Sequence, residues 1–80
     1  MKTKIVFSTE TSDNDFWFDL PIIPRIGEFL KANDFLDVNQ LFAIQETAHC
    51  WSGKKGLIQS VEYCKNDDGI YVEMYVWCED

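Results

Sequence analysis

The sequence predicts a small α+β domain with an antiparallel sheet of four or five strands and one helix. Three observations predict this class. In the last third of the chain, a segment rich in strand-forming residues is followed by an Asp-Gly turn and by a segment in which aliphatic residues alternate with aromatic and acidic ones. Two segments near the start are rich in residues that favour strands. Residues 34–51 carry apolar residues at helical spacing.

The length limits the chain to one small domain, which we assign to residues 1–80. Hydrophobic residues make up 46% of the sequence and aromatic residues 15%, which places it outside the disordered class. A core is therefore expected, although a domain of this size buries only about 60% of the surface that its unfolded chain exposes.

The clearest element is a C-terminal β-hairpin. Residues 57–64 form one predicted strand, residues 65–69 the turn and residues 70–78 the return strand. One face of the return strand is aliphatic and should meet the core, and it carries Ile70, Val72, Met74, Val76 and Cys78. The other face carries Tyr71, Glu73, Tyr75, Trp77 and Glu79.

The N-terminal part predicts two more strands, at residues 2–9 and 16–20, with the polar run 9–15 as a loop. Pro21 and Pro24 bracket residues 22–23, and this stretch is expected to be a sheet edge or an extended connector. A short strand is expected next, at residues 28–31. Within the first strand, one face would carry Ile5 and Phe7 and the other Lys4, Val6 and Ser8. Within the second, one face would carry Phe16, Phe18 and Leu20 and the other Trp17 and Asp19.

Residues 34–51 favour a helix, and a strand is the alternative. Asn33 or Asp34 could cap the helix, and Gly53 could end it. Two sets of apolar residues fit helical spacing: one is Val38, Leu41, Phe42 and Ala48, and the other is Leu41, Ile44, Ala48 and Trp51. The strand interpretation rests on the alternation of Phe42, Ile44, Ala48 and Cys50, which Glu46 interrupts.

The net charge of −7 disfavours direct binding to nucleic acid or to an anionic membrane. No apolar run approaches the ~20 residues of a membrane span, and the first residues do not resemble a signal peptide. Three cysteines, an odd number without C-x-x-C spacing, are typical of reduced thiols. We therefore expect a cytoplasmic protein.

No catalytic constellation is evident. His49 and Cys50 are adjacent, so their side chains diverge on a helix and oppose each other on a strand. A zinc site from His49, Cys50, Cys64 and Cys78 would need intervals of 13 residues between its cysteines, which match no common zinc spacing. We expect no enzyme activity, no metal and no cofactor.

The order of these segments resembles small bacterial SH3-like barrel proteins. In that family a Pro-Arg-hydrophobic-Gly-acidic segment opens a strand and a final hairpin follows. The matching residues here are Pro24 to Glu28, Ile58 with Val61, and Val72 to Val76. The resemblance covers about half of the chain, and residues 31–56 are longer than the family's connection. It implies an SH3-like, partly open barrel, and it implies a fold more than a function.

The candidate binding site is the aromatic and acidic face formed by Tyr71, Glu73, Tyr75 and Trp77, which Trp17 joins if the strands at 16–20 and 70–78 are neighbours. Aromatic rings with a few acids suit a protein-binding surface, so the leading hypothesis is a non-enzymatic interaction or accessory module. The alternative for this face is that the helix covers it. The alternative function is an acidic inhibitor that mimics nucleic acid on a basic partner protein. A protein partner or self-association is expected.

Overall fold

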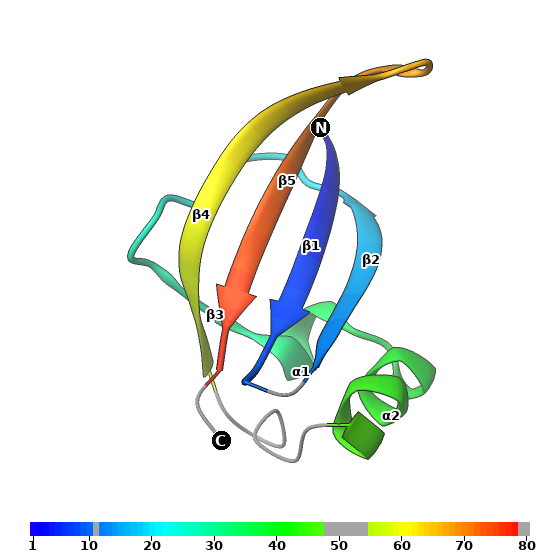
Figure 1. Ribbon diagram of the computed structural model, residues 1–80, viewed down its shortest axis with the longest axis vertical. Helices are drawn as coiled ribbons and strands as arrows, with labels where there is room; N and C mark the ends of the chain where they lie inside the picture. The colour runs from blue at the N-terminus through cyan, green and yellow to red at the C-terminus, as the bar shows by residue number, and fades with distance from the viewer. Residues whose placement is uncertain (11, 48–54, 79–80) are drawn as a thin grey trace.

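The computed structural model describes residues 1–10, 12–47 and 55–78, and its ribbon is shown in Figure 1. Five strands and two short helices follow one another along these parts of the chain: β1 (Lys2–Ser8), β2 (Asp13–Asp19), β3 (Phe29–Lys31), α1 (Ala32–Phe35), α2 (Val38–Thr47), β4 (Lys55–Asn66) and β5 (Gly69–Trp77). The α+β class is confirmed. No helix in the described parts is long and apolar enough to cross a membrane.

The five strands form one curled sheet, a half-barrel, in the order β2-β1-β5-β4-β3 (Figure 1). The sheet is mixed, so the prediction of a purely antiparallel sheet is wrong. The β1–β2, β3–β4 and β4–β5 pairs are antiparallel, whereas β1 and β5 are parallel, with Ile5 opposite Met74. The parallel pair joins an N-terminal hairpin to a C-terminal hairpin at the centre of the sheet.

The hydrophobic core lies on one side of this sheet. Side chains of β1 and β5 at the centre of the cluster, among them Phe7 and Met74, are fully buried. Leu36 and Ile44 complete the cluster from the helical segment. We call the opposite side of the sheet the open face.

Two short helices replace the single predicted helix, and the longer one starts later than expected. The predicted cap at Asn33 or Asp34 is wrong, because both residues lie inside α1. The Asp37 carboxylate accepts a 2.8 Å hydrogen bond from the Gln40 amide, and the Gln40 side chain accepts one of 3.0 Å from the Asp37 amide. This reciprocal capping box fixes the start of α2. The predicted helix end at Gly53 lies outside the described residues.

The C-terminal hairpin is confirmed, with β4 longer than predicted at both ends. Gly69 has φ +119°, a conformation that suits glycine, and the Asn66 side chain accepts a 2.9 Å hydrogen bond from the Asp68 amide. Val72 and Val76 are fully buried, as the alternation predicts. Ile70 is 69% exposed, contrary to prediction, because it lies beyond Val72, the last β5 residue toward the turn that β1 pairs with.

The first two strands and the short strand after the prolines are confirmed, each with shifted bounds: one residue for β1 and β3, and more at the start of β2. β2 begins at Asp13, inside the run predicted as a loop, and Asp13 pairs with Ser8 of β1. The Ser8 hydroxyl donates a 2.6 Å hydrogen bond to the Asp13 carboxylate, and this bond holds β1 and β2 together at this end. Residues 21–28 form an irregular connection.

Candidate functional site

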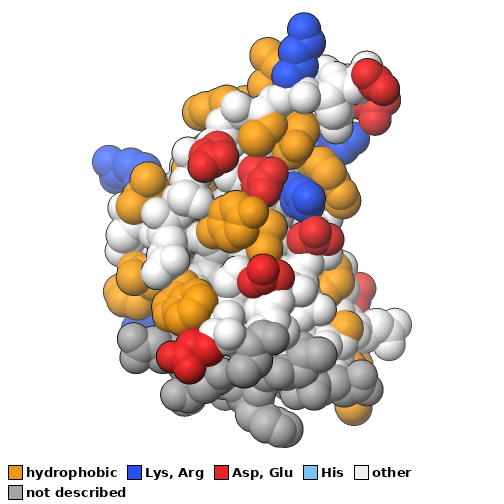
Figure 2. All heavy atoms as spheres, in the orientation of Figure 1, with side chains coloured by type: hydrophobic (Ala, Val, Ile, Leu, Met, Phe, Trp, Pro, Cys, Tyr) orange, Lys and Arg blue, Asp and Glu red, His pale blue; other side chains and the backbone are white. Residues whose placement is uncertain are grey.

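The five predicted site residues lie together on the open face. Trp17 comes from β2, and Tyr71, Glu73, Tyr75 and Trp77 occupy alternate positions of β5. Trp17 is 46% exposed and Tyr75 is 36% exposed, and the other three are half-buried. Figure 2 shows acidic side chains interleaved with hydrophobic ones across this face of the molecule.

The described part of α2 does not cover this face. The alternative prediction, that the helix packs over the aromatic residues, is therefore wrong for that part of the helix. Ile44 of α2 is fully buried in the core cluster, and Leu41 packs against that cluster. The cluster contains Ile5 and Met74, whose side chains point away from Tyr75 because successive residues of a strand alternate faces. The helix therefore packs on the opposite side of the sheet.

An aromatic contact spans the central part of the open face. Because β1 lies between β2 and β5, the strands that carry Trp17 and Tyr71 are not neighbours. Their rings nevertheless meet edge-on with centroids 5.1 Å apart. The Lys2 ammonium lies 5.1 Å from the Trp17 ring, within the range of a cation–π interaction.

Carboxylates outnumber cations in the part of the open face formed by β2, β1, β5 and residues 60–66 of β4, where the cations are Lys2 and Lys4. Glu62 of β4 is directly opposite Glu73 of β5, so their side chains project from the same face. Lys4 is the β1 residue next to Glu73, but its ammonium pairs with Asp15 at 3.5 Å. The cross-strand glutamates thus form a like-charge pair, an arrangement that destabilises a sheet.

Two tyrosines of the open face have raised pKa values. A hydrogen bond to the Glu73 carboxylate, and then the charge of that carboxylate, raise the pKa of Tyr75. Burial raises the pKa of Tyr71, with a smaller effect from Cys64 beside it. Cys64 lies opposite Tyr71, and its sulfur is 3.9 Å from a Glu73 oxygen.

The predicted site left out four acidic residues of this face, namely Asp13, Asp15, Asp19 and Glu62, although Asp19 was expected on the same side of its strand as Trp17. The three aspartates alternate along β2, and all three are exposed. The signal was present in the sequence as Asp-Asn-Asp-Phe-Trp-Phe-Asp, whose acids fall on every second position except that of Trp17. Lys31 and Lys55, which pair at the β3 corner of the same face, bound the acidic area.

The residues considered for catalysis or metal binding are not brought together in the described structure. Cys64 is half-buried on the open face, whereas Cys78 is buried in the core cluster on the other side. His49 and Cys50 lie outside the described residues. Among the residues that are described, no three of His, Cys, Asp and Glu are placed to hold a metal ion.

Comparisons with protein-family models, with curated proteins and with solved structures find no match for this chain.

Proposed function

We propose that this protein is a non-enzymatic interaction module whose open face binds a positively charged segment of a partner protein. The observation that carries the proposal is the like-charge pair of Glu62 and Glu73 on a face lined by exposed aromatic rings. Such a pair costs stability in the isolated domain. A lysine or arginine side chain of a partner, placed between the two carboxylates, would remove that cost.

The surrounding rings suit the same ligand. Trp17, Tyr71 and Tyr75 flank the glutamate pair with large, rigid surfaces. Cations bind over aromatic faces, and Tyr and Trp give contact area at low cost in conformational entropy. Lys2 already uses the Trp17 ring in this way. The face thus offers both elements of a site for a basic and partly apolar segment.

The test is affinity capture of a partner from the native host, followed by quantitative binding with purified variants. Glu62→Gln with Glu73→Gln should raise the Kd for the partner at least tenfold, because both carboxylates that hold the cation are neutralised. Trp77→Ala should also weaken capture while the fold is retained. Asp34→Asn, an exposed acid on α1, is the matched control and should bind like the wild type. Equal binding by all variants would refute the proposal.

A second candidate is an acidic inhibitor that mimics nucleic acid. It is supported by the exposed aspartates on β2, namely Asp13, Asp15 and Asp19, which project from one face of the strand with Trp17 between the last two. It predicts that DNA or RNA competes for the partner and that affinity falls steeply with salt. Substitution of the three aspartates by asparagine would then weaken binding more than the change at Glu62 and Glu73.

Two further proposals concern fold type and location. We propose an SH3-like, partly open barrel, supported by the curl of the sheet and by the segment from Pro24 to Glu28 that leads into β3. The parallel β1–β5 pair is a departure from the antiparallel sheet expected of such a barrel. A cytoplasmic location is supported by the odd number of cysteines, and a fluorescent fusion in the native host would test it.

A further inference from the structure

Among the described residues, no strand neighbours the outer edge of β4 over most of its length. β3 pairs with β4 only between Lys55 and Leu57. Just beyond, the Ile58 amide donates to the Glu28 carbonyl, and the Ile58 carbonyl accepts from the Gly27 amide, each at 2.9 Å. No described residue pairs with this edge of β4 after Ile58.

The direction of the exposed backbone groups follows from the neighbouring ladder. The Cys78 amide donates to Ser8, so Cys78 and, by alternation, Met74 face β1, whereas Tyr75 and Glu73 face β4. The β4 residues opposite this second set, such as Glu62, therefore bond to β5. It follows that Val61, Tyr63 and Lys65 direct their N–H and C=O groups away from the sheet.

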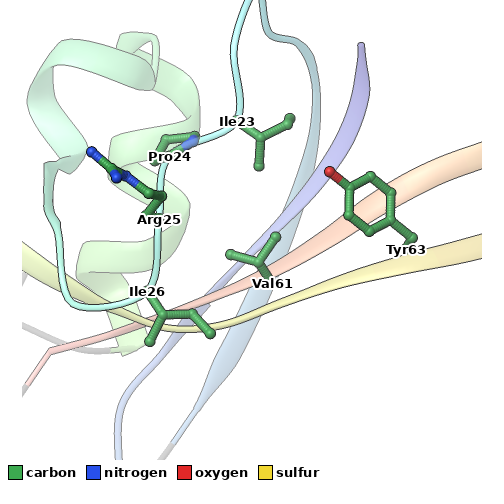
Figure 3. Close-up of a pocket in the computed structure, with 6 residues that line it drawn as sticks. All are labelled: Ile23, Pro24, Arg25, Ile26, Val61 and Tyr63. Atoms are coloured by element: carbon green, nitrogen blue, oxygen red, sulfur yellow. The ribbon is translucent and has the colours of Figure 1, made fainter.

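A groove runs beside this edge on the core side of the sheet. Its volume is about 420 Å³, enough for apolar side chains. It is lined by Ile23, Pro24, Arg25, Ile26, Val61 and Tyr63, and Figure 3 shows the connector residues on one side and the two β4 residues on the other. Ile26 and Tyr63 are 63% and 68% exposed, so apolar surface is presented to solvent next to unpaired backbone.

We propose that this edge is a second binding site, at which an extended peptide of a partner adds a strand to β4 in line with β3. Unpaired main-chain groups at alternate residues are what an added strand satisfies, and the groove receives every second side chain. The peptide would carry apolar residues at alternate positions and acidic residues near its ends. Lys65 stands at one end of the edge and Arg25 on the rim at the other, and both are exposed. The Arg25 guanidinium also lies 3.8 Å from the Glu28 carboxylate, an exposed ion pair for which an acid of the peptide would compete.

Charge favours such a peptide over a second copy of this chain. In a two-fold antiparallel pair of β4 strands centred on Tyr63, Lys65 of one copy would lie opposite Val61 of the other. Because Val61 and Arg25 line the same groove, this register would bring two positive charges close together. A pair centred on Glu62 would set two carboxylates against each other.

The direct test is an NMR titration of the full chain with a capped peptide of alternating valine and threonine that has a glutamate at each end. We expect the amide signals of Val61, Tyr63 and Lys65 to shift at peptide concentrations of about 1 mM or below. A strand bonds to a sheet edge through alternate residues. Two peptides should therefore differ: N-methylation of the amides that face β4 should abolish binding, and N-methylation of the amides in between should leave binding unchanged.

Protein variants separate the site from the fold. Tyr63→Pro removes an outward amide while leaving the bonds from β4 to β5, so it should abolish binding with the thermal transition retained. Lys65→Ala and Arg25→Ala should each raise the Kd severalfold, and Lys31→Ala, an exposed lysine on β3, is the matched control. No shift at these amides, equal loss with both methylation patterns, or a dimer formed through β4 in sedimentation would overturn the proposal.

Discussion

The indole of Trp17 contacts the ring of Tyr71 edge-on, with centroids 5.1 Å apart, across a strand that belongs to neither residue. β1 carries Lys2 and Lys4 between them, and the Lys2 ammonium lies against the indole. The contact therefore links β2 directly to β5, two strands that share no backbone hydrogen bonds, through side chains alone.

This contact predicts a measurable coupling between the two rings. In a double-mutant cycle with Trp17→Ala and Tyr71→Ala, we expect a coupling energy of about 0.5–1.5 kcal/mol in the free energy of unfolding. Urea denaturation of the four proteins gives this quantity. As a control, Trp17→Ala should show no coupling with Phe42→Ala, which lies on α2. A coupling of zero for the ring pair would mean that the contact does not stabilise the domain.

The capping box predicts different effects for two aspartates that are three residues apart. Asp37→Ala should lower the free energy of unfolding by about 1 kcal/mol, because the Gln40 amide loses its acceptor. Asp37→Ser should restore most of this loss, since serine is also a good cap. Asp34→Ala, at an exposed position inside α1, should change stability by less than about 0.5 kcal/mol. Thermal and urea unfolding measure all three.

Alanine substitutions at two apolar residues of α2 should differ strongly in their effect on the free energy of unfolding. Ile44 is fully buried in the core cluster, so Ile44→Ala should cost about 2–5 kcal/mol, a large part of the stability of so small a domain. Phe42 is 65% exposed, and Phe42→Ala should have little effect on unfolding. Similar losses in both variants would show that α2 packs with another face toward the sheet.

The raised pKa values of Tyr71 and Tyr75 predict a loss of stability at alkaline pH. A tyrosine whose pKa is higher in the folded state stabilises the fold below the ordinary value of 10.0, and this contribution disappears as the pH rises through the folded pKa. Glu73→Gln should lower the pKa of Tyr75, for which Glu73 is the main cause, more than that of Tyr71, for which burial is. Absorbance titrations of tyrosinate in Tyr71→Phe and Tyr75→Phe backgrounds would separate the two. An equal response of both tyrosines would contradict this assignment.

The parts of the fold that were predicted correctly depend on neighbours in sequence. Alternation alone places Val72 and Val76 in the core and Tyr75 on the other face, because a strand turns each residue to the side opposite its neighbour. Ile70 broke the pattern since its position along the sheet, beyond the reach of β1, depends on strand lengths elsewhere in the chain.

The parts that were missed depend on pairing between distant segments. Nothing local indicates that β1 lies parallel to β5, and Asp13 and Asp15 are residues that strands usually avoid. Pairing with β1 overrides that preference. The cap was different, because Asp37 and Gln40 are at the spacing of a capping box and could have been recognised in the sequence.

For the site, the shared face of Tyr71, Glu73, Tyr75 and Trp77 follows from the two-residue period of one strand. The inclusion of Trp17 required β1 to be the intervening strand, and the pairing of Glu62 with Glu73 required the register of the hairpin. That register includes an irregularity between Ile58 and Ser60, which no sequence pattern indicated.

The pairing of β1 with β5 has a consequence for how the protein folds. Thr3 is matched with Val72, almost the whole chain away, and this seam is the only ladder that joins the two hairpins of the described sheet. Each hairpin alone leaves its apolar face exposed, so neither should persist until the seam closes. Closure over so long a loop is entropically slow, and we expect a single cooperative transition with a folding rate nearer to all-β proteins than to helical bundles of the same size.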